Sequence, residues 1–363
     1  QKTSLVPPPR RVYDVVTLLQ RDDRNDNRET RAFLKEARAA TPAGLSEAQL
    51  ANFLLKRGQA AQQLGLMHQA RNDLRRAYRL AVDSGLTTYD FKFHLASVES
   101  PFGNHRIVGQ LVAMSARESG YLARYAYMVK HYARLGDLKS AQDWRREALA
   151  HYQSMLLRYP RASRHPMNQY ALAEMAAVLL EARGQFAEAE PHRRTMVANF
   201  SQTLKRKYPS WLLYHEICLI HNLASQGRLV EAEIESRRAI EESVAFGGKG
   251  SYYSAMACQQ LGRILIQQNR LQEARAILEV SITSAIASGT PHDTPLVGTI
   301  RLDLVEVLAM QGRPAEAAEQ FKMAEGCFLE PGHLANKLLF RPALLAALAQ
   351  TGRYEKALAY VEA

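Results

Sequence analysis

A short turn motif recurs eight times along this chain, and it limits the possible folds more than any other feature of the sequence. Each copy has a Gly, or in one case an Asn, followed five residues later by Ala in seven copies and by Val in the eighth. Gly and Asn tolerate the left-handed backbone that ends a helix. A small residue in the next helix then lets two antiparallel helices approach closely. The turn positions are Gly65, Gly103, Gly136, Gly184, Gly227, Asn269, Gly312 and Gly352.

The distance between the turns indicates one pair of helices for each turn. Successive turns lie 33–48 residues apart, with a mean of 41. Apolar residues between them follow the 3.6-residue period of a helix, as Leu261 and Leu265 do. Pro and Gly separate the pairs, for example at Tyr208-Pro209. No alternating strand pattern competes, so we predict an all-α fold of about eight helix pairs.

The first 44 residues precede the first repeat. They begin with an extended leader that ends in Pro7-Pro8-Pro9 and contain two short helical stretches, at 12–20 and 30–40. We predict that residues 1–44 are an N-terminal extension that caps the first hydrophobic end of the repeats.

The repeat array itself is predicted to occupy residues 45–363. Ser46 has the side chain of an N-cap for the first repeat helix. The chain stops six residues after Ala357, within the second helix of a pair. Because repeat arrays usually finish with a polar capping helix, we expect the native protein to continue.

Charge is distributed unevenly along a chain whose net charge is +11. Residues 1–210 carry 33 Lys and Arg against 19 Asp and Glu, whereas residues 211–363 carry 14 against 17. A basic half could contact nucleic acid, an anionic membrane or an acidic protein, and solvated Arg-rich helix faces have the same composition. No apolar run approaches the roughly 18 residues of a membrane-spanning helix, so we predict no membrane span.

Motifs that carry chemistry are missing from the sequence. His215, Cys218 and His221 have helical spacing, but no fourth zinc ligand accompanies them. The segment GGKGS at 247–251 lacks the spacing of a phosphate-binding loop. Cys258 and Cys327 show no paired spacing with Cys218 and are expected to be small core residues. We therefore predict a chain that is not an enzyme and that has neither a cofactor nor a metal site.

The Gly-x-apolar-x-x-Ala turn resembles the tetratricopeptide repeat (TPR). Where that family has an apolar residue followed by Gly or Ala before the turn, this chain has Leu95-Ala96, Ala176-Ala177 and Leu261-Gly262. The family's early Trp is absent, and the mean period of 41 residues exceeds the ordinary period of about 34. The longer repeats are similar to those of kinesin light chains. The resemblance covers roughly residues 46–363 and implies a right-handed α-α superhelix, the TPR solenoid.

A second resemblance concerns the beginning of the chain. PPPRRVYDVVTLL (7–19) and PAGLSEAQLANFLLKRGQAAQQLG (42–65) resemble the opening of bacterial multidomain proteins in which a TPR array precedes a caspase-like CHAT peptidase domain. The motif of that domain is not in this chain. The resemblance implies a CHAT His and Cys beyond Ala363.

The TPR resemblance also implies where a ligand binds. The first helix of each pair lines the concave face of a TPR superhelix, and the family's ligand-facing positions are counted back from the turn Gly. In this chain they carry amide, aromatic and cationic side chains, which suit an extended peptide. The implied ligand-binding residues are Lys56, Gln59, His94, Tyr127, Lys130, Arg134, Tyr214, His221, Gln259 and Arg263.

Three of these residues determine the expected chemistry of the partner. Lys130, Arg134 and Arg263 are expected to form a positively charged strip with Tyr127 beside it, so the partner should be an extended, acidic protein or peptide. The sequence thus predicts a non-catalytic scaffold or sensor. Two alternatives stay open: the regulatory TPR region of a bacterial CHAT-type cysteine peptidase, and a nucleic-acid-binding helical repeat that uses the basic residues 1–210.

Overall fold

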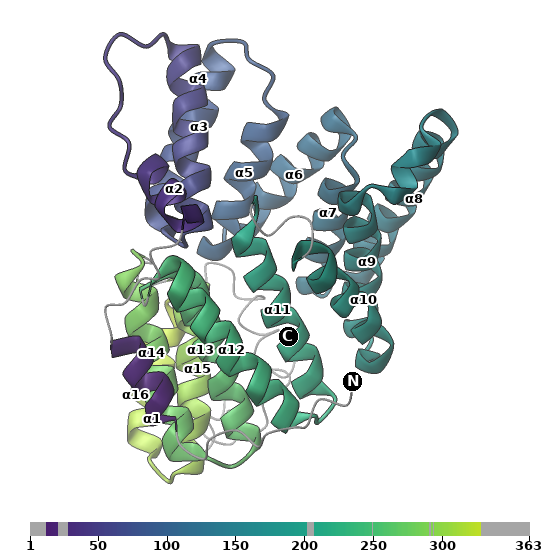
Figure 1. The fold of residues 1–363 in the computed structure, drawn as a ribbon. Coiled ribbons are helices and arrows are strands. Elements are labelled where there is room, and N and C mark those ends of the chain that lie inside the picture. Colours follow the sequence, from purple (N-terminus) through teal and green to yellow (C-terminus); the bar gives the residue numbers. More distant parts are fainter. Residues whose placement is uncertain are drawn as a thin grey trace. The chain divides into compact units, whose positions relative to one another are not determined.

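Helices form the regular structure of the described residues (Figure 1). The computed structural model describes residues 12–20, 28–201, 207–248, 250–289, 292 and 294–327. Within these ranges there are sixteen α-helices, two short 3-10 helices and no strand, which confirms the predicted all-α fold class. None of the described helices is long and apolar enough to cross a membrane.

The chain divides into two units. The first unit is residues 26–215, and the second unit is residues 1–25 together with 216–363. The helices of the first unit are α2 (Arg28–Ala37), α3 (Glu47–Gln63), α4 (Met67–Asp83), α5 (Tyr89–Glu99), η1 (Ser100–Phe102), α6 (His105–Ser119), α7 (Leu122–Arg134), α8 (Leu138–Arg158), η2 (Pro160–Arg164), α9 (Pro166–Glu181) and α10 (Phe186–Asn199). Helix α11 (Pro209–Ser225) begins in the first unit and ends in the second. The other helices of the second unit are α1 (Tyr13–Gln20), α12 (Leu229–Gly247), α13 (Tyr252–Gln267), α14 (Leu271–Ala287), α15 (Pro295–Met310) and α16 (Pro314–Glu325).

Seven of the eight predicted turns lie within the described residues, and all seven are confirmed. Their Gly or Asn residues have φ angles between +58° and +81°, in the left-handed region. The small residue five positions later is at most 1% exposed in every pair. The predicted turn at Gly352, and with it the eighth helix pair, lies outside the described residues.

Hydrogen bonds at the helix ends show how the turn motif works. At Gly184 the N–H of Gln185 donates to the carbonyl of Leu180 over 2.9 Å, and the N–H of Gly184 donates to the carbonyl of Glu181 over 2.9 Å. This is the pairing of a helix that ends in a left-handed residue. It satisfies the last carbonyls of α9 and turns the chain so that α10 begins at Phe186.

Two helix contacts leave no room even for a methyl group. A Cβ built on Gly262 would lie 2.6 Å from Cδ2 of Leu278, and one built on Gly58 would lie 2.8 Å from Cγ of Leu74. Each of these glycines lies seven residues before the Gly or Asn of its turn, at the position where the repeat pattern has Gly or Ala. They let α13 pack tightly on α14 and α3 on α4.

We expect Gly262→Ala to destabilise the second unit by about 1–3 kcal/mol, because overpacking a tight contact costs that much. Gly326→Ala is the matched control, since a Cβ there would meet only the carbonyl oxygen of Met323, at 3.9 Å. Chemical denaturation followed by circular dichroism would measure both changes. Equal stability of the two variants would show that Leu278 moves aside at no cost.

The predicted N-terminal segment does contain two short helices. Helix α2 packs against α3, whereas α1 packs against α12 and α14 in the second unit. Nothing in residues 12–20 alone indicated that position for α1. Ser46 caps α3 as expected, in a reciprocal pair of hydrogen bonds with Gln49. The boundary between extension and array at residue 44 stays a prediction.

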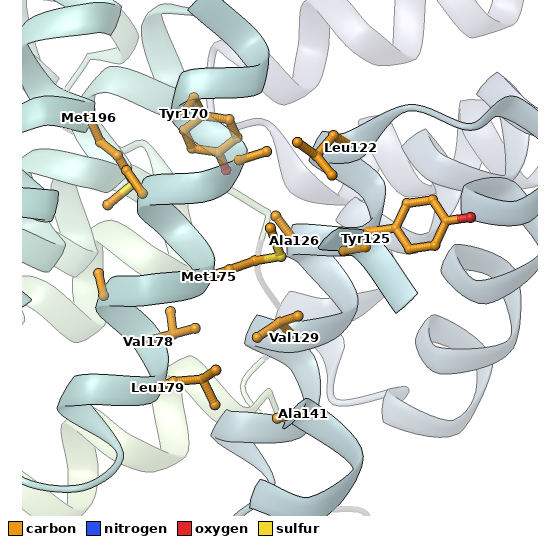
Figure 2. Close-up of a cluster of buried hydrophobic side chains, with 14 of the residues drawn as sticks. Leu122, Tyr125, Ala126, Val129, Ala141, Tyr170, Met175, Val178, Leu179 and Met196 are labelled. Carbon is orange, nitrogen blue, oxygen red and sulfur yellow. The ribbon is translucent and has the colours of Figure 1, made fainter. Parts of the chain in front are cut away.

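A buried core in the first unit holds α7 beside α9 (Figure 2). Leu122, Ala126 and Val129 of α7 belong to the same buried cluster as Met175 and Val178 of α9. Each is less than 9% exposed. Because Glu174 and Lys130 are the immediate neighbours of Met175 and Val129 in the chain, this packing also sets the two charged residues in register.

Candidate functional site

The first turn of α11 lies against helices that were expected to contact a ligand. The side-chain oxygen of Gln63, at the end of α3, accepts hydrogen bonds from Ser210 Oγ at 2.8 Å and from the Ser210 N–H at 3.2 Å. The ring of Trp211 lies 6.3 Å from the ring of Phe93 in α5. The start of α11 thus packs against α3 and α5 within the first unit.

Two tyrosine rings, from α7 and α11, lie close to the ammonium group of a lysine. Lys130 of α7 has its ammonium nitrogen 4.6 Å from the ring centre of Tyr127 and 4.9 Å from that of Tyr214 in α11. Such positions allow cation–π attraction from both rings. Lys130 is only 8% exposed, so both contacts lie mostly away from water.

Arg134 lies at the solvent end of the same cluster. Its guanidinium carbon lies 5.5 Å from the ring centre of Tyr214, and its Nη2 donates a hydrogen bond to the Tyr214 hydroxyl. Arg134 is exposed and Tyr214 is half-buried. Of the two α7 cations predicted to face a partner, only Arg134 reaches the surface.

A fully buried carboxylate lies beside the lysine. Glu174 of α9 has Oε1 at 3.7 Å from Lys130 Nζ, and its Oε2 lies 3.8 Å from Arg193 Nη1 and 3.5 Å from His215 Nδ1. Within the described part of the chain, neither carboxylate oxygen has a hydrogen-bond partner. Burial alone would raise the pKa of Glu174, but the surrounding charges, with Lys130 foremost, lower this pKa to about 2. Glu174 is therefore ionised and compensates the charge of Lys130.

This pairing corrects the expectation of a positively charged strip. Lys130 is buried and has a carboxylate beside it, so its charge is not presented to a partner. Arg263 of α13 also has an acidic neighbour: its Nε lies 3.4 Å from an oxygen of Asp303 in α15. Gln259 donates a hydrogen bond of 2.7 Å to the other oxygen of Asp303. Asp303 is 1% exposed, so it holds these two side chains from within the second unit.

The remaining four predicted site residues differ in exposure. Lys56 of α3 is exposed, Gln59 is half-buried on the same helix, and His94 of α5 is half-buried with its ring 5.6 Å from that of Phe93. His221 of α11 is exposed. A ligand-binding role for the ten residues stays a prediction, and the structure brings Tyr127, Lys130, Arg134 and Tyr214 together.

Three histidines of the first unit are held in their neutral form. Burial lowers the pKa of His94 and of His131 to about 4 and that of His215 to about 3. Asp90 and Glu174 oppose these shifts at His94 and His215, and the neighbouring cationic groups add to the shift at His131. Around the described residues there is no group of three His, Cys, Asp or Glu side chains placed to hold a metal ion.

Sequence counting missed Arg193 and Trp211. Arg193 belongs to α10, the second helix of its pair, and the rule for ligand-facing positions covers only first helices. Its neighbour Arg194 is partly exposed and pairs with Glu190, while Arg193 is 3% exposed. A local signal does separate the two arginines: Arg193 has the helical spacing of the buried Ala189 and Met196, and Arg194 does not.

Two segments of the second unit match known protein families. Residues 255–284, in α13 and α14, and residues 299–321, in α15 and α16, each match a model described as the tetratricopeptide repeat. No curated protein matches the sequence. The matches bear out the TPR resemblance of the turn motif.

Several solved structures are similar to this one. A Rap protein in complex with competence and sporulation factor has 14% sequence identity and a TM-score of 0.58, over 96% of this chain and 93% of that one. BtubC (BKLC) from P. vanneervenii has 20% identity and a TM-score of 0.43, over 55% and 81%. A putative kinesin light chain of Podosopora anserina has 21% identity and a TM-score of 0.39, over 63% and 95%. The likeness to the Rap protein shows a shared helical-repeat fold.

Proposed function

We propose, from the tetratricopeptide repeats that this chain contains, that the protein is a non-catalytic scaffold or sensor which binds an extended, acidic segment of a protein partner. Repeats of this kind are protein-interaction modules. The Rap protein of similar fold was solved with competence and sporulation factor bound. That precedent supports ligand binding on this fold, and the chemistry of the partner is argued from the residues of this chain.

The observation that carries the proposal is the arrangement of Arg134 and Tyr214. An exposed guanidinium lies over a half-buried aromatic ring and donates to its hydroxyl. The guanidinium is therefore held in place before a ligand arrives, which reduces the entropy lost on binding. A planar guanidinium also matches a carboxylate in a two-point hydrogen bond. The group that we expect to bind Arg134 is an Asp or Glu side chain or a free carboxylate. An apolar side chain next to it in the partner would pack on the ring of Tyr214.

Lys130 has a supporting role in this proposal. Its ammonium lies between the rings of Tyr127 and Tyr214, and Glu174 neutralises it from within. It thereby fixes the ring on which Arg134 rests. Replacing Lys130 with Glu would put a second carboxylate beside Glu174 in the interior, so the binding test relies on Arg134 instead.

We expect Arg134→Glu to weaken binding of the natural partner by about tenfold to a hundredfold, because a charge-assisted hydrogen bond contributes about 1.5–3 kcal/mol. A pull-down with the wild-type chain and mass spectrometry would identify the partner, and calorimetry would measure the affinity of its purified segment. Arg145→Glu on α8 makes the same charge change on an exposed residue and should leave the affinity unchanged.

Two outcomes would count against this function. Equal loss of affinity in the Arg134 and Arg145 variants would mean that only net charge matters. Capture of nucleic acid in place of a protein, with an affinity that falls steeply as salt rises, would favour the basic-half alternative.

A further inference from the structure

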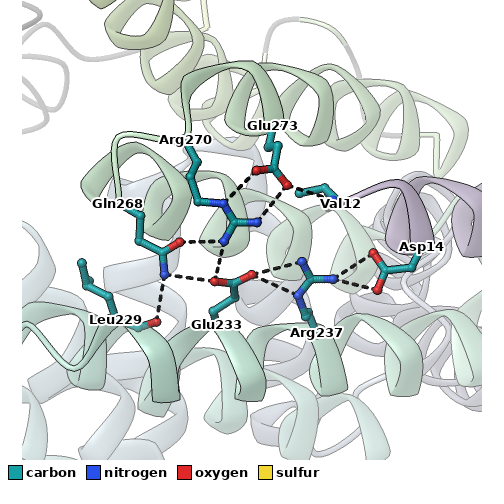
Figure 3. Close-up of polar contacts among 8 residues, drawn as sticks. All are labelled: Val12, Asp14, Leu229, Glu233, Arg237, Gln268, Arg270 and Glu273. Carbon is teal, nitrogen blue, oxygen red and sulfur yellow. Dashed lines mark hydrogen bonds and ion pairs between the residues drawn. The ribbon is translucent and has the colours of Figure 1, made fainter. Parts of the chain in front are cut away.

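The second unit has a charged surface built by α12 and α14 (Figure 3). Glu233 of α12 accepts hydrogen bonds from Arg237 Nη2 at 3.0 Å and from Arg270 Nη1 at 2.8 Å. Arg270 also donates two bonds of 2.8 Å to Glu273 of α14. Two acids and two arginines therefore form a chain of ion pairs across both helices.

Helix α1 is attached to this surface by its first residues. Arg237 Nη1 donates to both carboxylate oxygens of Asp14, at 2.9 and 2.8 Å, and the N–H of Val12 donates to Glu273 Oε2 at 2.9 Å (Figure 3). Val12 and Val15 are 2% and 5% exposed. The attached segment thus has a carboxylate between two buried valines.

The charged side chains of α12 and α14 remain paired with one another when α1 is absent. If α1 leaves, Arg237 keeps Glu233, and Glu273 keeps both bonds from Arg270. The four charges then cancel, so no buried ion loses its counter-ion, a loss that would otherwise cost several kcal/mol. Helix α1, in contrast, needs the surface, because an isolated helix of eight residues is unstable in water.

We propose that the α12–α14 surface is a binding site for a short helical segment of a partner protein, with an Asp between two apolar residues in the pattern Val-x-Asp-Val, and that α1 is its built-in, exchangeable occupant. Residues 12–15 of this chain carry that pattern. A partner segment with the same pattern competes with α1 for the ion pair with Arg237 and for the buried positions that Val12 and Val15 occupy. This site is separate from the one at Arg134 and does not depend on it.

The attachment of α1 within the same chain determines how the test is designed. A tethered segment has an effective concentration of the order of millimolar, so α1 excludes weakly binding peptides from the wild-type chain. Val12→Asp together with Val15→Asp places two charges at buried positions and releases α1. We call this double variant the open chain. The probe is a fluorescent peptide of residues 10–20, RRVYDVVTLLQ.

We expect the peptide to bind the open chain at least tenfold more tightly than the wild-type chain in fluorescence anisotropy. Replacing the Asp14 position of the peptide with Asn should weaken binding about tenfold when the open chain has Arg237. That replacement should have little effect when the open chain also carries Arg237→Gln, in which Glu233 retains Arg270 and Gln268.

Hydrogen exchange on the wild-type chain tests the same idea without any substitution. Amides of α1 should exchange at least tenfold faster than the buried amides of α12 and α14, because α1 leaves while the second unit stays folded. Equal exchange rates would overturn the proposal. So would equal peptide binding by the wild-type and open chains, or the same effect of the Asn peptide with and without Arg237. A wild-type dimer that the valine changes convert to a monomer would assign the segment to a second copy and overturn the assignment to another protein.

Discussion

Replacing Glu174 with Gln should lower the free energy of unfolding of the first unit by about 3–5 kcal/mol, the usual cost of removing one partner from a buried ion pair. The side chain is 0% exposed, and its oxygens lie within 4 Å of Lys130, Arg193 and His215. Without the carboxylate, the buried ammonium of Lys130 loses the charge of Glu174 beside it, whereas Arg193 retains two hydrogen bonds to Glu181. Most of the cost should therefore come from Lys130.

Tryptophan fluorescence during urea unfolding measures this change selectively. The chain has two Trp residues, Trp144 and Trp211, and both belong to the first unit. Glu188→Gln, at an exposed position of α10, is the matched control and should change stability by about 0.5 kcal/mol or less.

A second variant separates the charge effect from a simple loss of packing. Adding Lys130→Met to Glu174→Gln removes the buried ammonium that Glu174 compensates in the wild-type chain, so the double variant should be more stable than Glu174→Gln alone. If the double variant is instead less stable by the sum of two independent losses, the two side chains are not coupled. The buried pair would then have no part in holding α7 to α9.

The turns of the repeats and their tightly packed small residues could be predicted from the sequence, because the backbone at these positions restricts the residue type. A left-handed residue at Gly136 or Asn269 requires a particular residue type, and the closely packed position at Ala141 or Ala274 requires a small one. Such requirements repeat at each pair and are visible without any structure. Spacing from the turn also predicted that Tyr127, Lys130 and Arg134 share the first helix of one pair, and all three belong to α7.

Contacts between distant pairs could not be predicted in this way. The buried state of Lys130 depends on Tyr214, which lies 84 positions further along the chain, and on Glu174 in another pair. The docking of α1 depends on Arg237, which is 223 positions from Asp14. No repeat pattern encodes either contact, because each occurs once. An Arg or Lys that is paired in the interior has the same letter as one that is solvated.

The stability of the first unit should fall as the pH is lowered from 7 to 5, before the buried Glu174 is protonated. Burial lowers the pKa of His131 to about 4 and that of His215 to about 3 in the folded chain, whereas an unfolded His has a pKa of about 6.5. Below about pH 6.5 the unfolded state therefore binds protons that the folded state does not. Stability is fully present above that pH and decreases as the pH falls towards the folded-state values.

The expected loss is large for so narrow a range of pH. At pH 5 each of these two histidines should reduce the free energy of unfolding by about 2 kcal/mol relative to neutral pH. The half-buried His94 acts in the same direction, since its pKa is also lowered, to about 4. Because the pKa of Glu174 is lowered to about 2, its stabilising contribution declines only below about pH 4.5, and so the two effects are separated in pH.

Urea unfolding followed by tryptophan fluorescence at pH 5, 6, 7 and 8 would measure this dependence in the first unit. His131→Gln removes one titrating group and should make the slope of stability against pH between 6.5 and 5 shallower by about a third to a half, whatever its effect at pH 8. If the wild-type chain is equally stable at pH 7 and pH 5, the buried histidines are protonated at no cost, and the interior around Lys130 and Glu174 must open readily to water.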